Sequence, residues 1–201
     1  MIVKVCGITS EADARAAIEA GANALGFNFW PRSPRYIAAE AAAAFVPSLS
    51  GALKVGVFVD SAPEEIAAIA GRLRLDVAQL HGAAMPPPAV RFWRGASAGA
   101  GFDVSHLNEP EAEAYLLDTP AGALHGGTGR TFDWTRARTA ARRIIVAGGL
   151  DASNVAEAIA IAQPWGVDSC SRLESSPGVK DHAKVAAFVA AALSASLVTR
   201  S

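Results

Sequence analysis

Two side chains that could transfer protons stand at the ends of short apolar runs. Cys6 closes the run IVKVC, directly before Gly7, and Asp118 closes the run AYLLD. A thiolate can serve as a base, and a carboxyl group as an acid, when their surroundings adjust their charge. Position alone does not decide, because a free cysteine is often a small buried hydrophobe and an aspartate can simply cap a helix or lie in a loop.

Two further residues of this kind belong to other apolar runs. Asp168 lies near the end of GVDSC, at residues 166–170, and His81 follows DVAQL, at residues 76–80. An imidazole titrates near neutral pH, so by its chemistry His81 is the rival candidate for the base. Either residue can instead make a structural hydrogen bond and carry no chemistry.

Three glycine-rich or serine-rich turns predict a site for a phosphate group. They are GGTGR at 126–130, AGGL at 147–150 and SCSRLESSPG at 169–178. Backbone N–H groups exposed in such turns can surround an anion. Turns also need glycine for conformational reasons, so the alternative is ordinary loop structure. The candidate phosphate-binding residues are Gly127, Gly129, Gly148, Gly149, Ser171 and Arg172.

The elements that must position these groups are β-branched runs that alternate with alanine-rich helical stretches. Strands that are apolar on both faces and separated by helices indicate a parallel sheet of right-handed βαβ units. Eight units predict an α/β fold, a compact (β/α)8 barrel that forms a single domain over residues 1–201, with catalytic groups at the C-terminal ends of the strands. A doubly wound sheet of five or six strands is the rival and leaves two or three runs unexplained. The predicted strands are 2–6, 24–29, 53–59, 76–80, 90–94, 114–118, 143–148 and 166–170.

The helix signals are clear at some connections and weak at others. Ser10 is the expected N-cap of a helix that Gly21 ends, and Ser61 is the expected N-cap of a helix with Pro63 in its first turn. Three consecutive prolines at 86–88 predict that the fourth helix is reduced to a turn. A short helix near 108–113 is expected after the fifth strand.

Composition favours a small-molecule enzyme. A net charge of −1, with both signs interspersed along the chain, predicts no basic face for nucleic acid. Two cysteines that are not at metal-ligand spacing predict no metal site and a reducing, cytoplasmic compartment. The apolar tail at 185–198 is too short for a membrane helix, which needs roughly 20 residues. With no apolar excess beyond the needs of the barrel, a monomer is expected.

Eight motifs occur together in the order KVCGIT at 4–9, SPR at 33–35, VGVFVD at 55–60, QLHG at 79–82, LLDT at 116–119, GGTGRTFDW at 126–134, AGGL at 147–150 and ESSPGVKD at 174–181. In these motifs the chain resembles the phosphoribosylanthranilate isomerase family of tryptophan biosynthesis. The resemblance runs from Met1 to about Ala187. Its specificity comes mainly from KVCGIT followed by GGTGRTFDW, since QLHG or AGGL alone is common.

The resemblance implies a rearrangement of N-(5′-phosphoribosyl)anthranilate that needs no metal or organic cofactor. An acid protonates the ring oxygen, the ring opens to a Schiff base, and a base removes the C2′ proton to give an enolamine that becomes the ketone. Cys6 matches the family's general base, and Asp118 matches its general acid, whose pKa apolar surroundings are expected to raise. Arg35 matches the residue that pairs with the anthranilate carboxylate. Asp168 matches an aspartate that helps positioning, and His81 is expected to support the site.

The sequence departs from the family pattern where Arg172 follows Ser171, since the family usually has glycine there. If the position requires a positive φ, arginine costs on the order of 1 kcal/mol. We expect phosphate binding to be retained with altered geometry. A second oddity is Cys170, because the eighth strand of a closed barrel adjoins the first and could bring Cys170 to Cys6. A disulfide between them would disable the base.

Two other functions fit parts of this pattern. The aldose isomerase of histidine biosynthesis performs a similar rearrangement on the same barrel, but such relatives have aspartate where Cys6 stands. A barrel that binds a phosphorylated ligand without catalysis would fit Arg172 and the reduced fourth helix, although Cys6, Asp118 and Arg35 argue against it. A dinucleotide-binding fold is disfavoured, because no GxGxxG follows the first strand.

Overall fold

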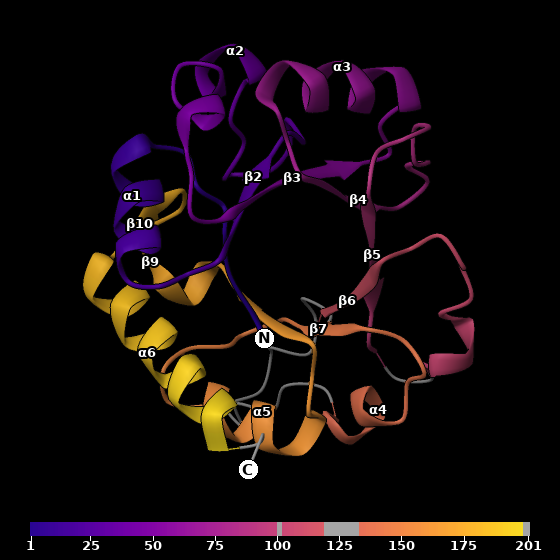
Figure 1. The fold of residues 1–201 in the computed structure, drawn as a ribbon, viewed down its shortest axis with the longest axis vertical. Coiled ribbons are helices and arrows are strands. Elements are labelled where there is room, and N and C mark those ends of the chain that lie inside the picture. Colours follow the sequence, from indigo (N-terminus) through magenta and orange to yellow (C-terminus); the bar gives the residue numbers. More distant parts are fainter. Residues whose placement is uncertain (100–101, 119–132, 199–201) are drawn as a thin grey trace.

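Eight parallel strands close into a barrel, with the order β1 to β8 around the ring and β8 paired back to β1 (Figure 1). The computed structural model describes residues 1–99, 102–118 and 133–198. The barrel confirms the predicted (β/α)8 fold and all eight predicted strands, and it removes the doubly wound alternative. The strands are β1 Ile2–Cys6, β2 Ala24–Asn28, β3 Leu53–Val59, β4 Val77–His81, β5 Phe92–Ser97, β6 Ala114–Asp118, β7 Ile144–Val146 and β8 Gly166–Ser169.

Helices surround this ring, and their ends follow the capping signals with one exception. The Ser10 hydroxyl accepts a hydrogen bond from the Asp13 backbone N–H at 3.1 Å and so caps α1, as predicted. The prediction for Ser61 is wrong, because Pro63 is the first residue of its helix and the N-cap position therefore falls on Ala62. The α-helices are α1 Glu11–Glu19, α2 Ala39–Ala42, α3 Pro63–Leu73, α4 Thr135–Arg138, α5 Val155–Ala162 and α6 His182–Val198.

The connections on either side of β5 are irregular. No helix forms between β4 and β5, as the three prolines predict. The helix expected at 108–113 is not there; instead a single 3-10 turn, η2, spans Val104–His106. Asp103 caps that turn by accepting a hydrogen bond from the Ser105 N–H at 2.8 Å, so the helical turn starts earlier than predicted. Further 3-10 turns are η1 Val46–Ser48 and η4 Ser171–Leu173.

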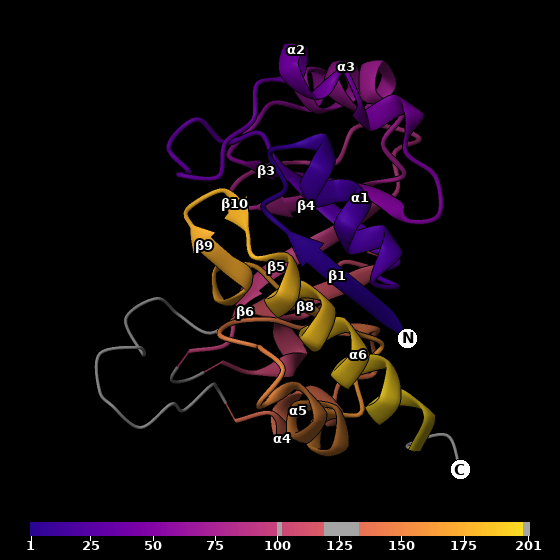
Figure 2. The same cartoon turned by 90° about the vertical axis from the view of Figure 1, so that its left-hand side faces the viewer.

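A small antiparallel hairpin follows the barrel at its C-terminal end. It consists of β9 Glu174–Ser176 and β10 Val179–Lys180. Figure 2 shows the hairpin on the side of the barrel toward which β1 runs. Thr9, in the loop that follows β1, donates a hydrogen bond from its hydroxyl to the Gly178 carbonyl at 2.5 Å. This contact fixes the hairpin beside the ends of β1 and β8.

Alternation along the strands separates two apolar clusters. Outward residues such as Val5, Leu80 and Phe58 pack against the helices. Inward residues form a second cluster, in which Trp93 is fully buried and packs edge-on against Trp165, with ring centroids 5.8 Å apart. That inner cluster comprises Ala24, Val55, Val77, Trp93, Ala114, Leu116, Ile145 and Ala147. Apart from Leu116, Ile145 and Ala147, its members lie in the first halves of their strands, so apolar packing fills the N-terminal end of the barrel.

Candidate active site

Cys6 is the last residue of β1 and points into the barrel, at the C-terminal end of the ring. Its side chain is almost fully buried. Two glycines make room beside it. Gly7 has φ +73°, and a Cβ there would lie 2.8 Å from the Cys170 sulfur and 2.9 Å from Cδ of Arg35. A Cβ on Gly26 of β2 would lie 2.6 Å from the Cys6 sulfur. The positive φ of Gly7 turns the chain sharply after β1, and this turn brings Cys6, Cys170 and Arg35 close together.

Lys4 lies one inward position before Cys6 on β1, and its side chain is fully buried. Its ammonium nitrogen is 2.8 Å from Oδ1 of Asp168 on β8. A Cβ on Gly26 would lie 2.9 Å from this nitrogen and 2.6 Å from the Cys6 sulfur. Lys4 therefore lies between Asp168 and Cys6. Burial alone would lower the pKa of Lys4, but the neighbouring Asp168 and Cys6 raise it above its usual value.

Cys6 and Cys170 form a hydrogen-bonded pair whose pKa values shift in opposite directions. The hydrogen bond from Cys170 lowers the pKa of Cys6 well below its ordinary value, and the charge of Lys4 acts in the same direction against the effect of burial. The same hydrogen bond, together with burial, raises the pKa of Cys170. This hydrogen bond confirms the predicted proximity of Cys6 and Cys170. Both cysteines are free, so no disulfide joins them in the structure.

Asp168 is the second titratable group at this depth. Burial raises its pKa to about 7, with a further contribution from Cys6 and against the opposing effect of Lys4. Lys4 is thus the one cation in direct contact with both Cys6 and Asp168 among the described residues, and the two groups compete for it. The negative charge of Asp118 also acts on Asp168, which places these inward groups of β1, β6 and β8 within one electrostatic environment.

His81 ends β4 and lies inside the barrel. Burial lowers its pKa. The Gln79 amide nitrogen lies 2.8 Å from Nε2 of the ring and donates to it, which gives that nitrogen the acceptor role. The ring packs over Gly95 of β5, where any Cβ would overlap it. A histidine held in this way fits the expected supporting role better than that of the base.

Arg35 comes from the loop after β2 and pairs with Glu174. Its Nε and Nη2 donate to the two carboxylate oxygens of Glu174 at 2.8 and 2.7 Å. Lys180, which is fully buried, contacts the same carboxylate at 3.1 Å and the Cys170 carbonyl at 3.1 Å. Burial alone would raise the pKa of Glu174, but Arg35 and Lys180 hold it below its usual value. The β9–β10 hairpin therefore fixes Arg35 at the mouth of the barrel, with only two of its five N–H donors used on Glu174.

Asp118 ends β6 as predicted, but its environment differs from the expectation. Residues 114–117 of the strand are buried, whereas the Asp118 side chain is exposed. The expected apolar enclosure of this carboxyl group is therefore not present in the described part of the chain. Asp118 is exposed because it is the last residue of β6 and lies at the rim of the barrel.

The predicted phosphate residues lie at the same end of the barrel, as far as they are described. Gly148 and Gly149 follow β7 with φ values of 87° and 67°, conformations that favour glycine. Ser171 and Arg172 open the turn η4 after β8. Arg172 does not have a positive φ, so the predicted strain is not present, and its half-exposed side chain lies 4.0 Å from an Asp151 oxygen. Gly127 and Gly129 lie outside the described residues.

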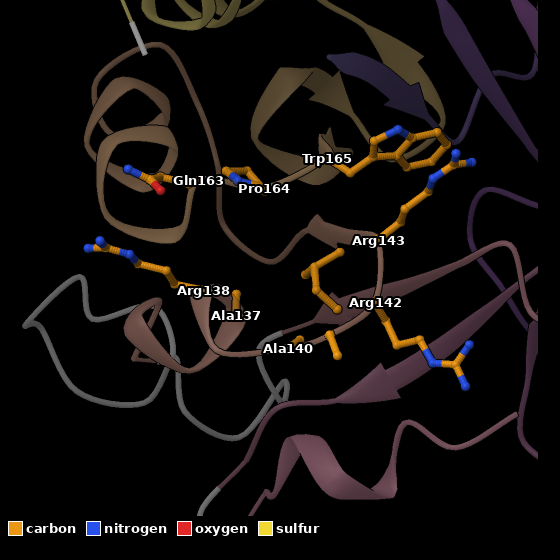
Figure 3. A pocket seen from close by; sticks show the side chains of 10 residues that line it. Ala137, Arg138, Ala140, Arg142, Arg143, Gln163, Pro164 and Trp165 are labelled. Atoms are coloured by element: carbon orange, nitrogen blue, oxygen red, sulfur yellow. The ribbon is translucent and has the colours of Figure 1, made fainter. Parts of the chain in front are cut away.

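A surface hollow of about 550 Å³ lies at the opposite end of the barrel, near the starts of β7 and β8. Figure 3 shows that the side chains of Arg138, Arg142 and Arg143 point in three different directions, with Arg143 against Trp165. Their charges do not converge on one point, and the hollow is far along the strands from Cys6. In the described ranges no helix is long and apolar enough to cross a membrane, and no cluster of three metal-ligating side chains occurs.

Sequence reasoning missed Lys4, Gln79, Glu174 and Lys180. For the first two a signal was present, because Lys4 and Gln79 lie two residues before Cys6 and His81, and side chains two apart share a strand face. For Glu174 and Lys180 the only local signal was their place in the motif ESSPGVKD. Glu174 acts through its contact with Arg35, 139 residues earlier in the chain, and Lys180 contacts the same Glu174 carboxylate.

These features define a class: a (β/α)8-barrel enzyme with a buried cysteine, carboxyl groups and glycine-rich turns at the C-terminal ends of its strands. Residues 3–191 match the family model described as N-(5′phosphoribosyl)anthranilate (PRA) isomerase. The chain belongs to this family.

Curated relatives and solved structures agree with this assignment. An N-(5′-phosphoribosyl)anthranilate isomerase of Solibacter usitatus (strain Ellin6076) is 55% identical over 198 residues, which cover 97% of this chain and 98% of the relative. The crystal structure of the enzyme from Thermotoga maritima is 34% identical, with a TM-score of 0.84 and coverage of 96% of this chain and 100% of that one. A further structure, 33% identical with a TM-score of 0.81 and the same coverage, holds reduced 1-(O-carboxyphenylamino)-1-deoxyribulose 5-phosphate.

Proposed function

We propose that the chain isomerises N-(5′-phosphoribosyl)anthranilate to 1-(2-carboxyphenylamino)-1-deoxyribulose 5-phosphate in tryptophan biosynthesis, with Cys6 as the general base and Asp118 as the general acid. Family membership supports the reaction. The observation that carries the assignment of the base is the position of the Cys6 sulfur inside the C-terminal end of the barrel, where the Cys170 thiol and Lys4 lower its pKa.

The proton transfers follow from the two groups. The Asp118 carboxyl protonates the furanose ring oxygen, and the C1′–O bond breaks as the anthranilate nitrogen forms a C=N bond. The Cys6 thiolate then removes the C2′ proton, and the electrons of the C–H bond form the C1′=C2′ bond of the enolamine. Protonation at C1′, with loss of the C2′ hydroxyl proton, gives the ketone. Substrate and product have the same atoms, so the reaction needs no oxidant or external proton source. The exposed position of Asp118 lets it meet a bound substrate at the rim.

The remaining candidates bind or orient the substrate. Arg35 pairs with the anthranilate carboxylate through N–H donors that Glu174 does not use. Asp168 and His81 lie deeper on the barrel wall and orient the ribulose moiety. The phosphate is held by Gly148, Gly149, Ser171 and Arg172, as expected for the loops after β7 and β8 in this fold. Gly127 and Gly129, which lie between β6 and β7 in the sequence, also hold the phosphate.

The test is the loss of anthranilate fluorescence as freshly generated phosphoribosylanthranilate is converted. We expect rapid conversion by the parent and a loss of at least about 100-fold in Cys6→Ala and in Asp118→Ala, the usual scale for general acid–base groups. Arg142→Ala, at the opposite end of the barrel, is the matched control and should retain parental rates. Near-parental rates in a folded Cys6→Ala variant would refute the assignment of the base.

The proposal includes the setting of the enzyme. We propose one catalytic domain over residues 1–201, acting as a monomer in the cytoplasm on a small phosphorylated substrate. Two free cysteines in contact fit a reducing compartment. Among the large exposed apolar side chains of the described residues, Leu193 and Leu197 share α6, whereas Tyr36, Met85 and Val179 lie on other parts of the fold. The Thermotoga maritima relative is described as dimeric, so sedimentation at micromolar concentration decides this point.

A further inference from the structure

We propose that Lys4 is the positioning residue that keeps the Cys6 sulfur in its anionic, basic form, and that Asp168 serves to fix Lys4 in place. The inference rests on the proposed role of Cys6 as the base. It adds a residue that local sequence did not single out and gives the buried pair of Lys4 and Asp168 a purpose in the reaction.

The Lys4 ammonium lies beside the Cys6 sulfur on the inward face of β1. The Lys4 ammonium and the Cys6 sulfur both lie within 3 Å of one point, the position that a Cβ of Gly26 would occupy. β2 therefore needs glycine at this position so that the ammonium can reach the sulfur. Lys4 and Cys6 share the inward face of β1, and the hydrogen bond to Asp168 at 2.8 Å holds the ammonium on the barrel wall.

Burial of the Lys4 ammonium carries a free-energy cost. An ammonium group removed from water is stable only when paired, and the removal of one partner from a buried ion pair is strongly destabilising. Lys4 is fully buried inside the barrel rather than at its apolar N-terminal end. A purely structural barrel could fill this position with an aliphatic residue at no loss. A cation placed beside Cys6 stabilises its thiolate instead.

Several other groups face Cys6, and they must be separated from Lys4 in any test. Cys170, after β8, is in hydrogen-bond contact, and Lys180 of β10 adds positive charge. Asp168 of β8, His81 of β4 and Arg35 of the loop after β2 also interact electrostatically with Cys6. Removal of Lys4 should raise the pKa of Cys6, whereas removal of Asp168 should leave it unchanged or lower it. Asp168 is therefore the group that best separates the effect of Lys4 from that of the other neighbours.

The experiment follows the titration of Cys6 by the ¹³Cβ chemical shift of labelled cysteine, without substrate or chemical reagent. All variants carry Cys170→Ser, which leaves one cysteine and keeps a hydroxyl donor beside it. Lys4→Met should raise the titration midpoint of Cys6 by about one pH unit or more, a tenfold change in the equilibrium. Asp168→Asn should leave the midpoint unchanged or lower it, because Lys4 then has Cys6 as its remaining anionic neighbour.

The double variant Lys4→Met with Asp168→Asn guards against misfolding, since replacing both members of a buried pair is often neutral for stability. Its midpoint should also rise by about one unit or more. An unchanged midpoint in the folded double variant, or a rise of equal size in Asp168→Asn, would overturn the proposal. The outcome is independent of the proposed reaction: activity in Cys6→Ala would refute the base while leaving the effect of Lys4 on the thiolate intact.

Discussion

The two ends of the barrel interior are built from the same eight strands but from different chemistry. At the N-terminal end the inward residues are apolar, with Trp93 and Trp165 in edge-on contact. Toward the C-terminal end the inward residues of β1 are Lys4 and Cys6, and β8 adds Asp168. One end therefore contributes the free energy of burial, while the other accepts the cost of buried charge in order to hold reactive groups.

The comparison predicts that a change at the N-terminal end affects stability rather than chemistry. Trp93→Ala should lower the free energy of unfolding by about 3–5 kcal/mol, the usual cost of removing a buried aromatic side chain. Chemical denaturation measures this change, with Trp93→Phe as the conservative control that keeps most of the ring. At a temperature where the variant is folded, its turnover number should stay within a few-fold of the parent. A loss of turnover comparable to that of Cys6→Ala would break the distinction between the two ends.

At the C-terminal end the opposite pattern is expected for Arg35. Arg35→Lys removes the planar fork that meets Glu174 in two parallel hydrogen bonds. Hydrogen bonds to charged groups contribute about 1.5–3 kcal/mol, so the KM for phosphoribosylanthranilate should rise by roughly 10- to 100-fold. Steady-state kinetics measure the effect, and the denaturation midpoint should change little because the side chain lies at the mouth. An unchanged KM in Arg35→Lys would exclude its proposed role.

The smallest effect is expected at the rim, where Arg172 is half exposed and lies 4.0 Å from Asp151. Exposed ion pairs contribute about 0–1 kcal/mol. Arg172→Gly, which restores the usual family residue, should therefore change KM by less than about fivefold and leave stability almost unchanged. A much larger rise in KM would make Arg172 a principal phosphate ligand and extend the functional end of the barrel outward.

The sequence by itself determined the strands, the order of the units and the family. Apolar, β-branched runs that alternate with helical stretches predict all eight strands within a few residues of their observed bounds. They do so because strand periodicity and helix capping are local properties. Ser10 caps its helix as predicted, whereas Ser61 is one residue too early because Pro63 opens the helix. The motifs KVCGIT at 4–9 and GGTGRTFDW at 126–134 were sufficient to indicate the resemblance and the candidate site.

Only the tertiary structure decided which groups meet. The contact between Lys4 and Asp168 joins residues 164 apart in the chain, and that between Arg35 and Glu174 joins residues 139 apart. Exposure was equally beyond local sequence: AYLLD predicts a buried strand, yet its final aspartate emerges at the rim. Charge states depend on burial and on neighbours in space, and closure of the barrel, which sets β8 against β1, brings the partners of Cys6 together.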